Sequence, residues 1–432
     1  MSRKHHPMFQ IALTANLFEW YEVSLTGLMA LEIGRLFFPV SGDKTALMLS
    51  FAVFAASYLA RPIGSVFFGL WGNKFGAGVA LKLSMTAMAI PAILIAFLPT
   101  YPRMGYLATC LLIALKLRQG FATGGEMPLS AYYVSLNAPD KHRGLYCGLV
   151  SCSSHLGMLL ASFVVFILPY CATLMSRIFP HRSAIEPFVA SWRWPFLLCI
   201  PLSLWIFSIR SPIAYLTTKG TPSIWRWHKQ PIAPLLNAAA LVAFTTLQLY
   251  ALFLWLPSYL HAYVGVSLYG ARLTHVIALS FFSICVAFLG YATRWISAPK
   301  LVFVGIGTLV LFSYPLFVIL QNGDFVSLLL VQLAFALMAG CLLGGIYIVL
   351  PDLFKDNWQS LGMTVCFTLP VAIFGGTAPL VCGYLIGATH LLTAPALYIV
   401  AMGLIALPVA YRLAFTGNNL SSTNVDGSLK NS

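Results

Sequence analysis

Long apolar runs recur along almost the whole of this 432-residue chain, separated by short polar connections. About twenty apolar residues in an α-helix span the hydrocarbon core of a bilayer. Runs of this kind begin at twelve places, near Phe9, Ala46, Gly78, Gly105, Leu145, Trp192, Pro231, Gly270, Lys300, Phe325, Ser360 and Thr393. The sequence therefore predicts an all-α membrane protein with twelve transmembrane helices and no large soluble domain.

The chain is also too poor in charge for a soluble protein. Hydrophobic residues make up 59% of it and charged residues 8%, whereas soluble domains carry about 25% charged residues. Strands of a membrane β-barrel alternate apolar and polar residues over about ten positions, but runs such as 107–115 and 301–312 are continuously apolar. Lipid is therefore the predicted solvent, and the spans are predicted to be helical.

A basic connection at residues 210–230 divides the apolar runs into two sets of six. We expect a six-helix half at residues 1–209 and another at 231–415, joined by this connection as a cytoplasmic linker. The tail at 416–432 is rich in Asn and Ser, so we expect it to be disordered in the cytoplasm.

The formal net charge of +14 comes from Lys and Arg residues that stand singly between the apolar runs. A nucleic-acid-binding chain gathers such residues on one face, so no nucleic-acid partner is expected. By the positive-inside rule, the larger group of basic loops lies in the cytoplasm. This rule places both termini on the cytoplasmic side of a plasma membrane, in bacteria the inner membrane, and we expect the chain to function as a monomer.

Sequence signatures of enzymes and ATP-driven pumps are missing from the chain. It contains no Walker A motif, no H-E-x-x-H and no G-x-S-x-G, so neither ATP hydrolysis nor hydrolase chemistry is predicted. Its nine cysteines form no C-x-x-C pair, which argues against a zinc site or a disulfide framework. We expect a protein that is not an enzyme and that binds no metal and no cofactor.

Three acidic residues fall inside predicted spans. Glu19 and Glu22 lie three residues apart in the first run, on one helical face, and Glu126 lies in the fourth run. An ionised carboxylate at the bilayer centre costs roughly 2.5–3.5 kcal/mol on insertion scales, so such residues usually face a bundle interior or an aqueous cavity. All three are candidates for proton coupling, because a carboxylate that is alternately hydrated and shielded can change its protonation state. The alternative is a structural ion pair.

The candidate charge partners are the basic residues inside the spans, Arg61, Lys116 and Arg118. A cation in this position either neutralises a carboxylate or holds an anionic group of a solute, and the sequence leaves both open. His155 lies inside the fifth run. A lone helical histidine is more often a hydrogen-bonded core residue than a proton relay, so it ranks behind the three acids.

Six short motifs, in order along the chain, resemble those of a known family. They are F-E-W-Y-E from Phe18, R-P-I-G-S-V-F-F-G-L-W-G-N-K-F-G from Arg61, Q-G-F-A-T-G-G-E from Gln119, S-W-R-W-P-F from Ser191, L-P-S-Y-L from Leu256 and F-G-G-T-A-P-L from Phe374. Together they resemble the metabolite–proton symporters of the major facilitator superfamily, which include proline/betaine, citrate, 2-oxoglutarate and shikimate carriers. The motifs span residues 18–380.

This resemblance implies two six-helix halves around a central cavity, with alternating access to a midplane site. It also implies proton-coupled uptake of a small zwitterionic or carboxylate solute. The residues that resemble the family's cytoplasmic gate, between the second and third helices, are Gly69, Gly72, Asn73, Lys74 and Gly76. Asn73 stands where the family has an acid and Ala77 where it has an arginine, which suggests a weakened or rebuilt latch.

Two other functions stay open at this point. A drug or metabolite efflux carrier would share the same fold, with a broad aromatic cavity and transport out of the cell. A transport-inactive receptor or scaffold is the second alternative, because the gate motif is eroded at Asn73 and Ala77.

Groups that contact the solute are expected from both halves, because alternating access closes one half over the other. The candidates are Tyr21, Gln119, Gln248, Tyr250, Phe367 and Thr368. Gln248 and Tyr250 point about 200° apart around a helix, at about 100° per residue. At most one of these two is therefore expected to face the cavity.

Overall fold

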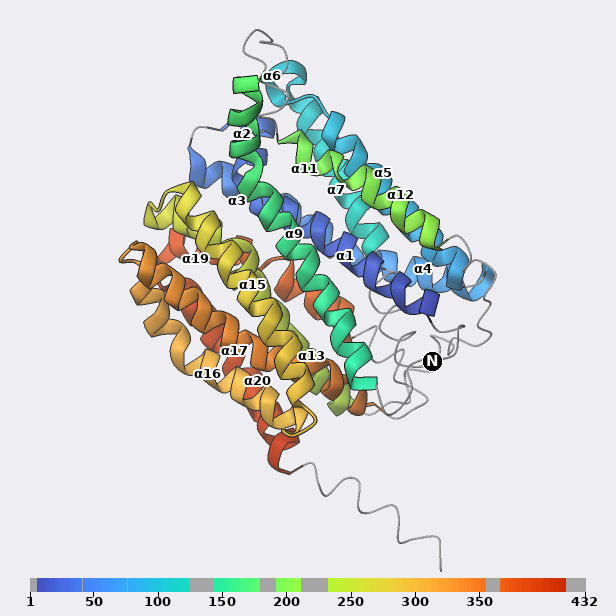
Figure 1. Cartoon of the computed structure of the whole chain (residues 1–432), viewed down its shortest axis with the longest axis vertical. Coiled ribbons are helices and arrows are strands. Elements are labelled where there is room, and N and C mark those ends of the chain that lie inside the picture. Colours follow the sequence, from blue (N-terminus) through green and yellow to red (C-terminus); the bar gives the residue numbers. More distant parts are fainter. Residues whose placement is uncertain are drawn as a thin grey trace, which may run out of the picture.

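Helices and short turns make up the part of the chain that the structure describes (Figure 1). The computed structural model describes residues 6–40, 42–75, 77–124, 143–178, 192–210, 232–354 and 366–416. No strand occurs among these residues. Eight of their helical segments are long and apolar enough to cross a membrane. The predicted all-α membrane architecture is therefore confirmed.

The helices of the first half pass back and forth along the bundle. In chain order they are α1 (His6–Leu28), α2 (Ala30–Phe37), α3 (Asp43–Leu59), α4 (Arg61–Phe75), α5 (Ala77–Phe97), α6 (Tyr101–Met104), α7 (Tyr106–Thr123), α9 (Arg143–Ile178), α11 (Arg193–Leu197) and α12 (Cys199–Arg210). Helices α3 and α4 form one span that is interrupted at Ala60. The interruption has a local cause, because Pro62 has no backbone N–H to donate to the carbonyl of Tyr58.

The second half contains long spans with π-helical turns inside them. Its elements are α13 (Ile232–Tyr250), η4 (Ala251–Trp255), α14 (Leu256–Tyr259), η5 (Leu260–Val264), α15 (Leu268–Ala292), α16 (Ala298–Leu320), α17 (Phe325–Asp352), η7 (Val371–Gly375), α19 (Ala378–Thr389) and α20 (Ala394–Phe415). Pro257 lies just after η4, and Pro370 lies just before η7. Proline removes a hydrogen bond of the α-helical pattern, and wider π turns near it are common at functional sites.

Turns between successive helices gather at the two ends of the bundle. One end, called here the Gly265 end, carries the turns at 38–40, 98–100, 265–267, 321–324 and 390–393. Contacts tie these turns together: Gly323 lies beside Val264 and Val266, and the Tyr259 hydroxyl donates to the carbonyl of Leu392. The opposite end, called here the Phe75 end, carries the turn at 293–297.

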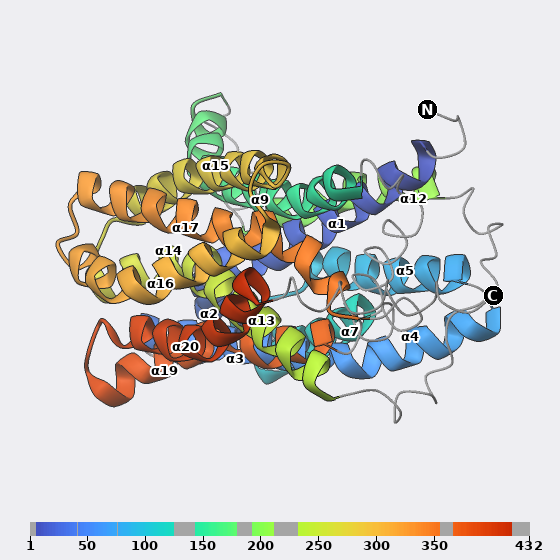
Figure 2. The same ribbon diagram turned by 90° about the horizontal axis from the view of Figure 1, so that it is seen from below.

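The two halves of the chain contact each other along two seams (Figure 2). Helix α9 packs against α15 along one seam, and α3 packs against η7 and α19 along the other. The second seam is tight, because a Cβ added to Gly376 would lie 2.2 Å from Cβ of Tyr58. Glu32 of α2 and Arg272 of α15 form an ion pair across the halves. The bundle is therefore closed at the Gly265 end.

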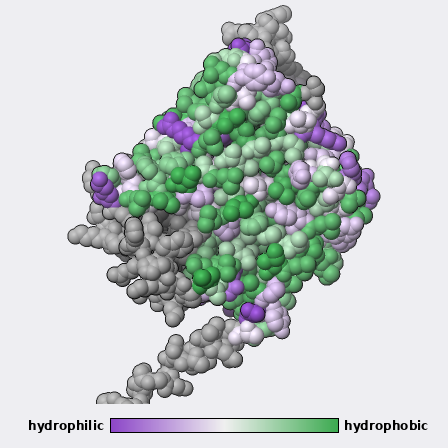
Figure 3. Space-filling view, turned by 180° about the vertical axis from the view of Figure 1, so that it is seen from behind, coloured by the Kyte–Doolittle hydropathy of each residue, from purple (hydrophilic) through white to green (hydrophobic). Residues whose placement is uncertain are grey.

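Large apolar side chains cover the outer surface of the bundle. Phe288, Leu311 and Leu330 are 64%, 67% and 60% exposed. Figure 3 shows hydrophobic residues over most of the coloured part of one face of the molecule. A surface of this kind is stable against acyl chains rather than against water, as expected for a chain that spans a membrane.

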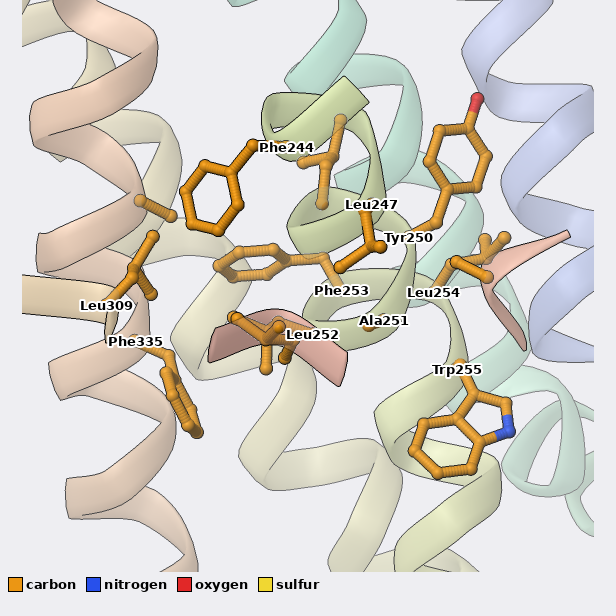
Figure 4. Packing of buried hydrophobic residues seen from close by; sticks show 14 of the residues in the cluster. Phe244, Leu247, Tyr250, Ala251, Leu252, Phe253, Leu254, Trp255, Leu309 and Phe335 are labelled. Atoms are coloured by element: carbon orange, nitrogen blue, oxygen red, sulfur yellow. The ribbon is translucent and has the colours of Figure 1, made fainter. Parts of the chain in front are cut away.

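Buried apolar side chains form two clusters, one inside the first half and a larger one centred on the second half. The larger cluster follows α13, η4 and α14, and it reaches into the first half through Phe54 and Tyr58. In Figure 4, Phe244 and Leu309 lie on one side of the α13 segment, while Tyr250 lies on the side that faces the first half. The core thus brings a tyrosine of the second half to the seam.

Candidate functional site

A buried ion pair joins α1 to α7 in the first half. Nζ of Lys116 donates hydrogen bonds to Oε1 of Glu22 at 2.6 Å, Oγ1 of Thr26 at 2.6 Å and Oε1 of Gln119 at 3.0 Å. All four side chains are buried. An ammonium group has three hydrogen-bond donors, so these three acceptors use all the donors of Lys116.

A second buried ion pair joins α1 to the start of α4. Nη1 of Arg61 donates to Oε1 of Glu19 at 3.1 Å. The guanidinium carbon lies 3.7 Å from the centre of the Tyr58 ring, which is a cation–π contact. Nε of Arg61 is buried and finds no hydrogen-bond partner among the described residues. Each acid of α1 therefore has its own cation, and the Arg61 guanidinium keeps a spare donor.

Two tyrosines connect this pair to the second half. The hydroxyls of Tyr58 and Tyr250 are 2.5 Å apart, and the two rings pack edge to face with centres 5.4 Å apart. Trp20, which follows Glu19 in α1, packs on Tyr250 with ring centres 5.8 Å apart. A continuous series of contacts thus runs from Glu19 through Arg61 and Tyr58 to Tyr250.

A cavity lies at the end of this series. Trp20 forms its wall on the first half, and the second half supplies the rest: Val242, Thr245, Thr246, Leu249, Tyr250, Leu343, Ile346, Tyr347, Leu350, Phe367 and Val371. None of these lining residues is charged. The cavity volume is about 20 Å³, which is room for one or two water molecules. An organic solute can enter only if the walls move apart.

Four aromatic rings line this cavity and give it a chemical preference. Trp20 packs on Tyr250, and the rings of Tyr347 and Phe367 lie 6.5 Å apart. Ring faces attract cations, and aromatic cages bind quaternary ammonium groups. The cavity is therefore suited to an ammonium group attached to a small apolar body.

The structure places the predicted solute-binding residues in different surroundings. Tyr250 and Phe367 line the cavity. Tyr21 is fully buried inside the first half, where its hydroxyl donates to the carbonyl of Pro195 at 2.7 Å. Gln119 accepts from Lys116 and is part of that ion-pair cluster. Tyr21 and Gln119 therefore act within the first half in this conformation.

Other predicted residues lie away from the cavity lining. Gln248 is fully buried, and its amide donates to the carbonyl of Thr245 at 3.1 Å. Thr368 is buried but is not a lining residue. His155 packs edge-on against Phe282 of α15, with ring centres 4.7 Å apart, so it contributes to the contact between α9 and α15.

Among the charged candidates, Arg118 is exposed on the surface of α7. The gate-like residues 69–74 lie inside helix α4, which continues to Phe75 instead of ending in a loop before them. Phe67, Trp71 and Phe75 stack at four-residue spacing, with ring centres 5.7 Å and 4.6 Å apart, and such pairs stabilise a helix. Two predicted residues lie outside the described part of the chain, namely Glu126 and Gly76.

Four residues of the site were not singled out from the sequence. Tyr58 precedes Arg61 by three residues, so helical spacing could have pointed to it. Trp20 is one residue after Glu19 and two before Glu22, and residues at these spacings do not share a helical face. Thr26 follows Glu22 by four residues, on the same face. Tyr347 carries no such signal, because an isolated tyrosine in an apolar run has no marked partner in the sequence.

Known proteins resemble this chain along almost its whole length. The sequence profile of the family described as sugar (and other) transporter matches residues 8–223. The ectoine/proline transporter ProP of Corynebacterium glutamicum is 30% identical over 426 residues, 94% of this chain and 83% of the relative. The glycine betaine/proline/ectoine/pipecolic acid transporter OusA of Dickeya dadantii is 27% identical over 436 residues, 94% of this chain and 83% of the relative.

Solved structures share the fold. A crystal structure of a D-xylose-proton symporter has a TM-score of 0.70 at 14% identity, covering 94% of this chain and 97% of the other. A partially occluded, inward-open structure of the xylose transporter XylE from E. coli has a TM-score of 0.66 at 15% identity, covering 94% and 96%. The chain therefore belongs to the sugar (and other) transporters of the major facilitator superfamily, and it is a membrane-spanning transporter.

Proposed function

We propose that this chain takes up a small zwitterionic solute of the proline and betaine kind together with protons. The names of its relatives supply the solute class. The observation that carries the proposal is the cavity beside Tyr250, which is rich in aromatic rings and has no charged lining residue. A zwitterion has no net charge, and its ammonium group fits against ring faces in a lining that holds no charged residue.

Alternating access follows from the position of the cavity between the halves. Because the seam is closed at the Gly265 end, we expect the cavity to exchange its contents through the Phe75 end in this conformation. Rocking one half against the other would open the Gly265 end and close the Phe75 end around the same site. The cavity widens during this movement, because Trp20 and Tyr250 belong to opposite halves.

Proton coupling is assigned to the two ion pairs of the first half, Glu22 with Lys116 and Glu19 with Arg61. A proton on either carboxylate removes its charge and releases the cation, which gives each pair two distinct states. The driving force is adequate, because one charge moving through the membrane potential contributes about 2.3 kcal/mol per 100 mV. Glu126 remains a third candidate.

We further propose that the Phe75 end faces the cytoplasm of a bacterial inner membrane, with both termini inside, and that a monomer is functional. The described basic residues at that end include Lys74, Arg143, Arg210, Arg294, Lys300 and Arg412. Those at the Gly265 end include Arg35, Lys44, Arg103, Arg193 and Arg272. The distribution supports this orientation by the positive-inside rule.

The test is transport by purified protein in proteoliposomes with an imposed pH gradient. Labelled glycine betaine and L-proline should accumulate against their gradients, and a protonophore should abolish accumulation. Trp20→Ala and Phe367→Ala should each raise the solute concentration that gives half-maximal uptake by about three- to thirty-fold. This is the range expected for the loss of one cation–π contact. The matched control is Phe312→Ala, because Phe312 is exposed on α16 and should have no effect.

Other outcomes separate the alternatives. Transport of lipophilic drugs out of cells, without uptake of zwitterions, would identify an efflux carrier. A folded protein that moves no solute in either direction would support a receptor or scaffold and refute the proposal.

A further inference from the structure

We propose that Arg61 couples proton and solute by requiring one anion at a time, either the Glu19 carboxylate or the carboxylate of the bound solute. This inference rests on the proposed function, because it assumes a solute that carries a carboxylate. Its basis is a buried guanidinium that contacts Glu19 on one side and, through Tyr58, the cavity-lining Tyr250 on the other.

Burial makes a counter-ion obligatory for Arg61. The residue is 6% exposed, and a guanidinium stays protonated under physiological conditions. A buried charge that loses its partner is strongly unfavourable. Any state of the closed seam must therefore supply an anion to this side chain.

The geometry offers a second anion site beside the first. Nε of Arg61 is a buried donor without a partner among the described residues. The guanidinium lies against the Tyr58 ring, and the Tyr58 hydroxyl meets that of Tyr250 from the opposite half. A solute whose ammonium group lies among the cavity rings would direct its carboxylate toward these hydroxyls and Arg61, once the walls move apart to admit it.

Among the described residues, the other charged groups near Arg61 are already engaged. Glu22, the second acid of α1, also lies in its electrostatic surroundings, but Glu22 is paired with Lys116 of α7. Lys116 has three acceptors of its own. Of the two buried cations described in the first half, Arg61 is thus the one with a donor left for a solute.

Four states of the carrier follow from this requirement. With Glu19 ionised and no solute, Arg61 is neutralised and the empty carrier can close. With Glu19 protonated and the solute carboxylate bound, Arg61 is again neutralised and the loaded carrier can close. Protonated Glu19 without solute leaves Arg61 unpaired, and ionised Glu19 with solute puts two anions on one cation. Both mixed states are disfavoured, which prevents leakage of protons or solute.

The experiment compares probes with and without a carboxylate, by equilibrium binding to the purified full chain across a pH series. The pairs are glycine betaine with choline, and L-proline with pyrrolidine. Affinity for glycine betaine and L-proline should rise as pH falls, by up to about tenfold per pH unit, the limit for one linked proton. Affinity for choline and pyrrolidine should rise with pH instead, because ionised Glu19 then neutralises Arg61.

Glu19→Gln fixes the protonated state and should abolish both opposing trends while retaining glycine betaine binding. In proteoliposomes it should retain counterflow and lose net uptake, because the empty carrier cannot neutralise Arg61. If the ion pair between Glu19 and Arg61 were merely structural, its loss in Glu19→Gln would reduce counterflow and uptake together. Glu32→Gln is the matched control, since Glu32 pairs with Arg272 away from Arg61, and it should keep both trends.

Two results overturn the inference while leaving the proposed function intact. One is the same pH trend for glycine betaine and choline in the natural chain, which needs no variant to fold. The other is persistence of the opposing trends in Glu19→Gln. If the natural chain binds none of the four probes, the proposed function fails, and the inference fails with it.

Discussion

At the scale of single residues, the burial of an ion pair determines how much its loss changes the free energy of unfolding. Glu22 and Lys116 are almost completely buried, whereas Arg35 and Asp43 have side chains that are 55% and 47% exposed. Both pairs have an N–O distance of 2.6 Å. Removing one partner of a buried pair leaves an uncompensated charge, while water replaces the missing partner of an exposed pair.

Lys116→Ala should therefore lower the free energy of unfolding by about 3–5 kcal/mol. Arg35→Ala should change it by less than about 1 kcal/mol. Denaturation of the purified protein in detergent, followed by circular dichroism, measures both. Equal losses for the two variants would show that burial of the Glu22–Lys116 pair has no energetic consequence.

The hydroxyl contact between Tyr58 and Tyr250 stabilises closure of the Gly265 end, so Tyr58→Phe should favour opening there. Tyr250→Phe should act in the same way, and the double variant should add little, because both remove one hydrogen bond. Labelling of a cysteine at Thr246, in the cavity wall, by a reagent applied at the Gly265 end reports the opening. Tyr259→Phe is the control, because its hydroxyl bonds within the second half. Additive effects of the two seam variants would contradict a shared bond.

Glycines determine how closely whole elements approach at the seam. Gly27 of α1 faces Leu254 of η4, where an added Cβ would lie 2.4 Å from Cγ of the leucine. Gly376 faces Tyr58 of α3 in a similar way. Cβ atoms essentially never lie closer than 3.0 Å to a heavy atom of another residue. The closed seam therefore requires residues without a Cβ at these two positions.

Gly376→Ala should hold the Gly265 end open and reduce solute turnover by at least about tenfold, because the added Cβ would clash with Tyr58 unless the segments separate. Gly387→Ala tests the same substitution in the same span, where nothing lies within 4 Å of the added Cβ, and should have no effect on turnover. Uptake in proteoliposomes, with cysteine accessibility of the cavity, measures both. Turnover of Gly376→Ala at the natural rate would show that the seam is not tight during transport.

At the scale of the whole molecule, basic residues predict which end of the bundle faces the cytoplasm. Asn322 is exposed in a turn at the Gly265 end, and Ser297 is exposed in a turn at the Phe75 end. In a variant without native cysteines, Asn322→Cys should react with a membrane-impermeant maleimide in intact cells. Ser297→Cys should react only after permeabilisation. The reverse pattern would invert the proposed orientation.

Much of the architecture could be predicted because the insertion of a helix into the membrane depends mainly on the residues of that helix. A helix in lipid satisfies its own backbone hydrogen bonds, so an apolar run of about twenty residues predicts a span without knowledge of its neighbours. The same reasoning drew attention to Glu19 and Glu22, because acids inside a span are costly. The helical extent of residues 69–74 was missed, since the aromatic stacking that continues α4 outweighed the loop pattern.

Partners across the bundle could not be predicted in this way. The contacts of Glu19 with Arg61, Glu22 with Lys116, and Tyr58 with Tyr250 depend on how each helix is rotated and which helix lies beside it. Spacing along one helix shows which side chains share a face, but it does not show what that face meets. The packing of helices inside the first half and at the seam sets these neighbours, and it buries Tyr21 inside the first half while Trp20 forms part of the cavity wall.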